Sequence, residues 1–253
     1  MSCPFLFLWG YLGGLRLGRQ AWHRGRLVLS PGLGGRLLSC HDAWQNKTPS
    51  MPMLDELLHR VRGYSPRPLE TERSFPEAAV LVPITRSDEP ELVLTLRASG
   101  LSTHGGEVAF PGGRRDPEDR DLVDTALREA EEEIGLPPGL VEVVGPLSSL
   151  VSRHGIQVTP YVGLVPDYVE YKANDAEIAS VFSVPLEFFR SDPREVTHRI
   201  DYLGQSWYVP SYTYGEYRIW GLTAIMVVEL VNLIFDDAQI ALHQPPEHFI
   251  HLR

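Results

Sequence analysis

The sequence predicts an α/β fold in which a mixed β-sheet lies between helices, an α/β/α sandwich. Short apolar runs rich in β-branched residues recur in the second and third quarters of the chain, which is the pattern of buried strands. One helical period interrupts them near residue 130 and another follows them near residue 225, and this mixture favours a layered sheet. The expected strands are Ala78–Thr85, Glu91–Arg97, Glu107–Phe110, Val141–Val144, Gln157–Val165 and Val181–Val184.

Composition divides the chain into three parts. Residues 1–50 hold six Lys or Arg, one acid and both cysteines, which leaves 17 basic and 32 acidic side chains in the rest. We expect residues 1–50 to be a non-catalytic extension, either disordered or translated from a start codon upstream of Met51 or Met53. A short amphipathic helix and a proline-rich lead-in are expected over residues 51–77, and the main domain over residues 78–253.

Charge and hydropathy argue against two classes of partner. The net charge of −10 disfavours nucleic acid, because binding its phosphate backbone requires an electropositive face. The apolar run Ile219–Phe235 contains Glu229 and Asn232 and is shorter than the roughly 20 apolar residues that cross a bilayer, so we expect a half-buried helix packed on the sheet. A body without cysteine needs no disulfide, which favours a cytoplasmic location.

The most informative stretch is residues 107–136, where a strand, a glycine loop and a helix follow one another. The sequence Pro-Gly-Gly at 111–113 ends the alternating apolar strand. Asp119 or Asp121 is suited to cap the helix that follows, and Gly135 to end it, with two prolines directly beyond.

Three carboxylates share one face of that helix, since Glu129, Glu132 and Glu133 are spaced at i, i+3 and i+4 beside an apolar stripe. Two interpretations are open. On a solvated face the like charges cost only about 0.2–0.5 kcal/mol. If the glycine loop folds over the helix, two charges about 4 Å apart repel by roughly 4 kcal/mol at an effective dielectric near 20, and a cation relieves the repulsion. Hard oxygen ligands that leave positions open for water and phosphate suit Mg²⁺ or Mn²⁺.

The glycine loop and the acidic helix together resemble the signature of the Nudix hydrolases. The residues that carry this resemblance are Gly113, Arg128, Glu129, Glu132, Glu133, Gly135 and Leu136. The loop is one residue longer than in that family, so that Glu118 or Asp119 stands in for its lone Glu. The resemblance implies a Nudix-type α/β/α sandwich, and with it a metal-dependent enzyme that hydrolyses a pyrophosphate bond.

Flanking segments resemble the branch of that family that cleaves coenzyme A. These segments are Leu94–Ala98, Gly106, Phe110–Gly113, Asp116–Asp119 and Tyr217–Ala224, so the resemblance covers nearly all of residues 75–235. Ser102 departs from the branch, which usually carries Arg there. The implied reaction converts coenzyme A or a derivative to 3′,5′-ADP and 4′-phosphopantetheine. The alternatives are an ADP-ribose or nucleotide-sugar hydrolase, and a non-catalytic nucleotide-binding module that keeps the fold.

The resemblance also implies roles for single residues. The expected catalytic residues are Glu132, Glu133, Arg128 and Glu177, the expected metal ligands are Glu129, Glu132 and Glu133, and the expected substrate contacts are Arg97, His104, Gly112 and Gly113. The nucleophile would be a metal-bound water. A small-molecule nucleotide is the expected partner, without nucleic acid or membrane, and a homodimer stays open.

Some of these side chains have a second interpretation. Arg128 is expected to orient the site through an ion pair with Glu132 at i+4 rather than to clamp phosphate. Arg97 ends a strand, where it either binds a substrate phosphate or forms an ordinary salt bridge, and His104 either contacts the substrate or lies at the surface by chance. Glu177 is an option for general base. Glu118 and Asp119 are candidates for further metal or water contacts.

Overall fold

The computed structural model describes residues 53–69, 73–100, 104–202 and 204–246. The expectations for residues 1–50, for a start at Met51 and for Ser102 lie outside the described residues. The helices are α2 (Met53–Gly63), α3 (Leu122–Ile134), α4 (Leu186–Arg190) and α5 (Gly221–Ile234), with a 3-10 turn at Pro138–Leu140. The strands are β1 (Glu77–Arg86), β2 (Glu91–Arg97), β3 (Val108–Ala109), β4 (Gly112–Arg114), β5 (Glu142–Pro146), β6 (Leu150–Val151), β7 (Gln157–Pro166), β8 (Ile178–Pro185), β9 (Glu195–Tyr202), β10 (Gln205–Tyr214) and β11 (Tyr217–Trp220).

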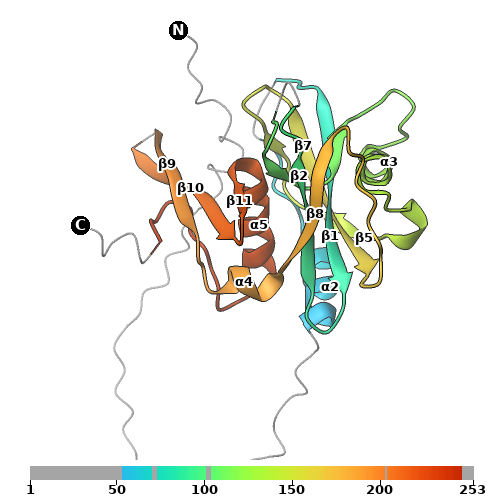
Figure 1. Cartoon of the computed structure of the whole chain (residues 1–253). Helices are drawn as coiled ribbons and strands as arrows, with labels where there is room; N and C mark the ends of the chain where they lie inside the picture. The colour runs from blue at the N-terminus through green and yellow to red at the C-terminus, as the bar shows by residue number, and fades with distance from the viewer. Residues whose placement is uncertain (1–52, 70–72, 101–103, 203, 247–253) are drawn as a thin grey trace, which may run out of the picture.

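The predicted mixed sheet forms the centre of the molecule (Figure 1). Within the described residues it has eight strands in the order β3-β2-β1-β7-β5, with β4 paired to β1, β6 to β7 and β8 to β2. Strands β1 and β7 run parallel over their whole lengths, whereas the other pairs are antiparallel. All six predicted strands are present, which confirms the expected fold class.

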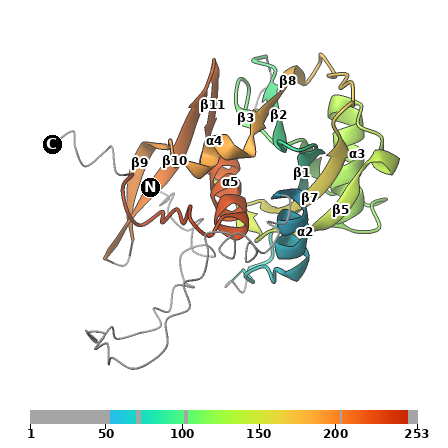
Figure 2. The same ribbon diagram turned by 90° about the horizontal axis from the view of Figure 1, so that it is seen from below.

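Helices cover both faces of this sheet (Figure 2). On one face, Ala126, Ala130 and Ile134 of α3 pack on Ala79 and Leu81 of β1. On the other face, α2 and α5 share a larger apolar cluster with the inward side chains of β1, β2 and β7. The short helix of the lead-in therefore belongs to the folded body, since its Leu57 and Val61 side chains are buried there.

A second sheet was not predicted from the sequence. Strands β9, β10 and β11 form an antiparallel sheet, and α5 packs against β10 and β11 (Figures 1 and 2). The Ile219–Phe235 run forms the predicted helix, but the helix is more buried than predicted. Nine residues of α5 are buried between the two sheets. Along the described parts of the chain, no helix is both long enough and apolar enough to cross a membrane.

The glycine segment is more ordered than a plain loop. The predicted strand over residues 107–110 is shortened to Val108–Ala109, and Gly112–Arg114 forms a separate strand, β4, that pairs with Ala78–Val80 at the start of β1. This pairing fixes the glycines against β1, an inner strand of the sheet, where β4 contacts α3.

Candidate active site

Helix α3 is held at both ends by local sequence. Asp121 is its N-cap, and the Asp121 side chain accepts a hydrogen bond from the Asp124 backbone N–H. Gly135 ends the helix in the left-handed conformation with φ 64°, which only glycine adopts without strain. A Cβ at Gly135 would also come within 3.2 Å of the Lys172 side chain. The two ends thereby set the register of the acidic face.

The glycine segment folds onto this acidic face. The Gly112 N–H donates to Oε2 of Glu133 at 3.0 Å. A Cβ on Gly113 would lie only 2.5 Å from both carboxylate oxygens of Glu129, so a residue with a side chain would displace that carboxylate. Glu133 is buried, Glu129 is half-buried, and Glu132 is exposed. The interpretation in which the loop covers the helix therefore holds for Glu129 and Glu133 and not for Glu132.

Arg97 joins two carboxylates from different elements. Its Nη1 lies 2.9 Å from Oε1 of Glu133, and its Nη2 lies 4.0 Å from Oε2 of Glu177. Of the two alternatives for Arg97, the structure shows the salt bridge at the strand end. Because Glu177 precedes β8 and Glu133 lies on α3, the guanidinium brings the loop carboxylate to the helix carboxylates.

Burial, more than repulsion between these carboxylates, raises the pKa values of Glu129 and Glu133. Burial raises the pKa of Glu133 to about 7, against the opposing effects of the Gly112 N–H and the Arg97 charge. Burial also raises the pKa of Glu129, where Arg128 opposes the shift and the charges of Glu132 and Glu177 add to it. Clusters of like charge with perturbed pKa values are typical of functional sites.

Arg128 is the centre of an ion-pair network at the start of the acidic face. It forms the predicted pair with Glu132 at 3.1 Å and a further pair with Glu129 at 3.0 Å. Asp119 lies buried beneath the guanidinium and accepts from Arg128 Nε at 3.0 Å and Nη2 at 3.1 Å. Asp119 also accepts from the Thr125 hydroxyl and the Asp116 N–H, and Arg128 holds its pKa well below the ordinary value. Asp119, a candidate for further metal or water contacts, holds Arg128 in this structure.

Two candidates lie apart from these contacts. The His104 side chain is exposed, pairs with Glu107 at 2.7 Å and meets the ring of His154 edge-on at 5.3 Å between centroids. Glu118 is exposed in the loop before Asp119. Across the part of the chain that the structure describes, no three His, Cys, Asp or Glu side chains are grouped closely enough to hold a metal ion. The Glu132 carboxylate is turned to Arg128 in this arrangement.

Sequence reasoning named Glu177 but missed how the segment that carries it docks on α3. The backbone N–H groups of Lys172 and Asn174 each donate at 2.9 Å to the carbonyls of Ile134 and Glu133 at the end of α3. The only local signal was the pair Asn174-Asp175, which is typical of a turn. Nothing local indicates that this turn docks on a helix forty residues earlier in the chain.

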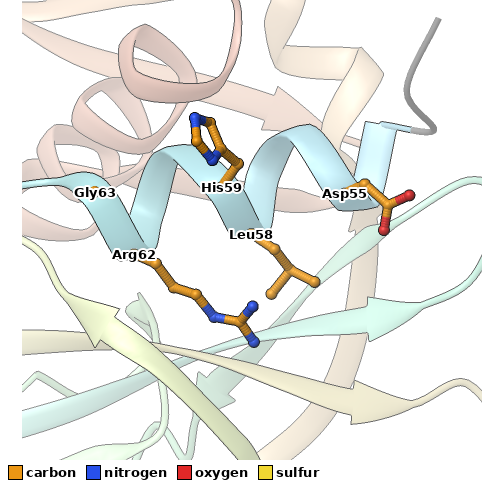
Figure 3. Close-up of a pocket in the computed structure, with 5 residues that line it drawn as sticks. All are labelled: Asp55, Leu58, His59, Arg62 and Gly63. Carbon is orange, nitrogen blue, oxygen red and sulfur yellow. The ribbon is translucent and has the colours of Figure 1, made fainter. Parts of the chain in front are cut away.

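A surface hollow elsewhere does not overlap the site. Asp55, Leu58, His59, Arg62 and Gly63 of α2 line a volume of about 440 Å³ (Figure 3). All five residues come from one helix, and none belongs to the carboxylate cluster. The candidate active site is the carboxylate cluster and not this hollow. It lies at the junction of the glycine segment, α3 and the loop before β8.

Comparison with known proteins finds similarity over the part of the chain that contains this cluster. The family model described as NUDIX domain matches residues 75–203, which include the glycine segment, α3 and Glu177. A relative from Yersinia enterocolitica, named "Uncharacterized Nudix hydrolase NudL", is 42% identical over 190 residues, which span 72% of this chain and 93% of the relative. A protein of the same name from Shigella sonnei is 41% identical over 182 residues, covering 70% of this chain and 93% of that one.

Solved structures are more distant. A Caenorhabditis elegans Ap4A hydrolase in a binary complex is 19% identical, with a TM-score of 0.37 over 44% of this chain and 80% of that chain. The NUDIX domain of Shewanella oneidensis NrtR, complexed with ADP ribose, is 21% identical, with a TM-score of 0.38 over 51% of this chain and 83% of that chain. At these TM-scores the two structures carry no argument about this chain.

Proposed function

Since this chain belongs to the Nudix hydrolase family, whose members hydrolyse the pyrophosphate bond of nucleoside diphosphate derivatives, we propose that its substrate is coenzyme A or a coenzyme A derivative. One water molecule adds across the P–O–P linkage, and the products are 3′,5′-ADP and 4′-phosphopantetheine, or its acylated form. The proposal for the substrate rests on the segments Leu94–Ala98, Phe110–Gly113 and Tyr217–Ala224, which resemble the coenzyme A branch.

The observation that carries the proposed activity is the contact of the glycine segment with the acidic face of α3. Buried Glu133, half-buried Glu129 and the neighbouring Glu132 offer hard carboxylate oxygens, and the bare Cα of Gly113 gives the Glu129 carboxylate the room that it occupies. This donor chemistry fits Mg²⁺ or Mn²⁺, so we assign Glu129, Glu132 and Glu133 as the residues that would hold the ion. When bound, such an ion neutralises phosphate charge and lowers the pKa of a coordinated water.

The chain's own side chains supply orientation and proton transfer in this proposal. Glu177 takes the proton from the attacking water, because a base must lie within hydrogen-bond reach of that water and Glu177 is held toward Glu133 through Arg97. Arg128 keeps Glu129 and Glu132 in place and is itself fixed by buried Asp119. The role of Glu177 depends on contacts between side chains far apart in the sequence, whereas that of Arg128 depends on partners within nine positions.

Substrate phosphates are proposed to meet Arg97, the backbone of Gly112 and Gly113, and His104. The turn that carries His104 is tied to Arg97, because the Gly106 N–H donates to the Arg97 carbonyl and the Arg97 N–H donates to the Glu107 carbonyl, each at 3.0 Å. This turn is therefore attached to the end of β2, where the Arg97 guanidinium contacts the carboxylate cluster.

Product analysis tests the proposal. Purified protein is incubated with coenzyme A, ADP-ribose or a nucleotide-sugar, each with Mg²⁺, with Mn²⁺ and with EDTA, and the products are separated and weighed by mass spectrometry. We expect 3′,5′-ADP from coenzyme A with either metal ion and none with EDTA. Faster cleavage of ADP-ribose would overturn the substrate and favour the alternative hydrolase. Saturable binding of coenzyme A without cleavage of any substrate would favour a binding module.

A further inference from the structure

The loop between β7 and β8 is docked on the C-terminal end of α3. The last carbonyls of a helix have no partner within it, and here two of them are satisfied by this loop. The Lys172 N–H donates to the Ile134 carbonyl, and the Asn174 N–H donates to the carbonyl of Glu133 itself, both at 2.9 Å. The loop is thus anchored at the residue whose side chain lies deepest in the carboxylate cluster.

From this anchor, Asn174 builds the turn that ends in Glu177. The Asn174 carbonyl accepts from the N–H groups of Glu177 and Ile178, each at 2.8 Å. The Asn174 side-chain Oδ1 accepts from the Ala176 N–H at 3.2 Å. Beyond the turn, the Glu177 carbonyl accepts from the Ala98 N–H at 2.7 Å, directly after Arg97. The backbone of Glu177 is therefore fixed on both sides.

We propose that Asn174 is a positioning residue of the active site, which sets the place of the Glu177 carboxylate relative to Glu133. The inference rests on the proposed function, in which Glu177 accepts the proton of the attacking water. The Asn174 backbone is hydrogen-bonded to the backbones of both residues: its N–H donates to the Glu133 carbonyl, and its carbonyl accepts from the Glu177 N–H. A base displaced by about 1 Å loses much of its effect, because proton transfer requires hydrogen-bond distance.

The Asn174 side chain contributes one hydrogen-bond acceptor to this turn, and a substitution can remove or keep it. It is exposed, so its removal leaves no cavity, and its Oδ1 is the acceptor that closes the turn on the Ala176 N–H. An aspartate at this position keeps an acceptor in the same place, whereas an alanine does not. The two substitutions therefore separate the acceptor from the general effect of changing the residue.

Steady-state kinetics of the full-length protein test the proposal. We expect Asn174→Ala to lower kcat about tenfold, equal to about 1.4 kcal/mol, with KM for coenzyme A unchanged within about twofold. Asn174→Asp should restore most of the lost rate. In a Glu177→Gln background, Asn174→Ala should cause little further loss, because two residues that act through the same group are not additive.

Asn232 provides a matched control. Its Oδ1 accepts from the Ile240 N–H at 2.6 Å and its Nδ2 donates to the Ile240 carbonyl at 2.9 Å, so its side chain also holds a backbone segment in place, the one that follows α5. We expect Asn232→Ala to lower the thermal midpoint and to leave kcat unchanged below that midpoint. Asn174→Ala should show the reverse pattern.

Several outcomes would overturn the positioning role. These are a wild-type kcat for Asn174→Ala, an Asn174→Asp variant no faster than the alanine variant, full additivity with Glu177→Gln, or a Glu177→Gln variant with wild-type turnover. In each of them a Glu133→Gln variant that has lost turnover would leave the proposed function intact. Turnover retained in Glu133→Gln would instead remove the assignment of the acidic face as the metal site, and the proposed function itself would fall only if the wild-type protein did not cleave coenzyme A.

Discussion

Two buried glutamates on opposite faces of the central sheet have surroundings of opposite kinds. Glu133 on α3 and Glu229 on α5 are equally buried, with 4% of each side chain exposed. Glu229 accepts from the Tyr64 hydroxyl at 2.5 Å and from the Ser148 N–H at 3.2 Å, and Arg67 lies 3.9 Å away. Its neighbours are hydrogen-bond donors that join the lead-in after α2 and the segment after β5 to α5.

The neighbours of Glu133 include negative charges, unlike those of Glu229. Its donors, the Gly112 N–H and Arg97, are accompanied by the carboxylates of Glu129 and Glu177. A buried carboxylate surrounded by donors contributes to the fold, whereas one surrounded by other carboxylates is stabilised by an added cation. The comparison teaches that burial alone does not mark a functional acid, and that the charge of its neighbours does.

The largest effect should come from Glu133→Gln, which removes one charge of the cluster and keeps the shape of the side chain. We expect hydrolysis to fall by several orders of magnitude, about 10³-fold or more, or at least roughly 4 kcal/mol of transition-state stabilisation. The thermal midpoint should hold or rise, because a repulsive charge is gone. Initial rates with Mg²⁺ and a melting curve measure both quantities.

The control for this prediction is Glu131→Gln on the same helix. Glu131 is exposed and lies on a different side of α3, so its substitution should leave the rate within about twofold. Equal losses in the two variants would show that acidity of the helix as a whole, and not the Glu133 site, is what matters.

Glu229→Leu should produce the opposite pattern. It leaves the Tyr64 hydroxyl and the Ser148 N–H without their acceptor, and we expect the free energy of unfolding to fall by about 2–4 kcal/mol, or roughly 5–15 °C in thermal midpoint. The rate should stay near that of the wild type below the new midpoint. Glu229→Gln, which keeps an acceptor, should lose less. Loss of turnover without loss of stability would break the distinction between the two glutamates.

Stability of the EDTA-treated protein should depend on pH through Glu133. Its pKa of about 7 in the folded state lies above the ordinary glutamate value, so between about pH 4.5 and pH 7 the folded protein binds a proton that the unfolded chain has released. The free energy of unfolding should therefore fall as pH rises through this window, by up to about 3 kcal/mol, and level off above it.

Urea unfolding at pH 5 and pH 8 measures this dependence. The Glu133→Gln variant cannot release that proton and should show a smaller decline than the wild type. The difference between the two proteins isolates Glu133 from other titrating groups, including Glu129, whose pKa is also raised. Identical declines would mean that Glu133 is not the group responsible.

The smallest effect is expected from removal of residues 1–50. We propose that they contribute neither to catalysis nor to the core, because their basic, glycine-rich composition contrasts with the acidic body. A chain that starts at Met51 should keep its thermal midpoint within a few degrees and its full rate. A drop of more than about 10 °C, roughly 2.5–5 kcal/mol for a domain of this size, would place the extension within the fold.

Local patterns were sufficient for the central fold and for the acidic face. The apolar runs, the Asp121 cap and the Gly135 stop predicted β1, β2, β7 and α3, because each depends on residues within a few positions of one another. The spacing of Glu129, Glu132 and Glu133 placed them on one face for the same reason. The β9–β11 sheet was missed because its apolar residues face α5, an element later in the chain.

By itself, therefore, the sequence determined that this protein has a capped acidic helix after a glycine segment, within a mixed sheet between helices. Only the tertiary structure decided which of the three glutamates is buried, that Asp119 holds Arg128, and that Arg97 links Glu133 to Glu177. It also decided that Asn174 docks on the end of α3. The physical reason is range: caps and helical faces follow from neighbours in sequence, whereas burial and the pairing of charges depend on side chains that only folding brings together.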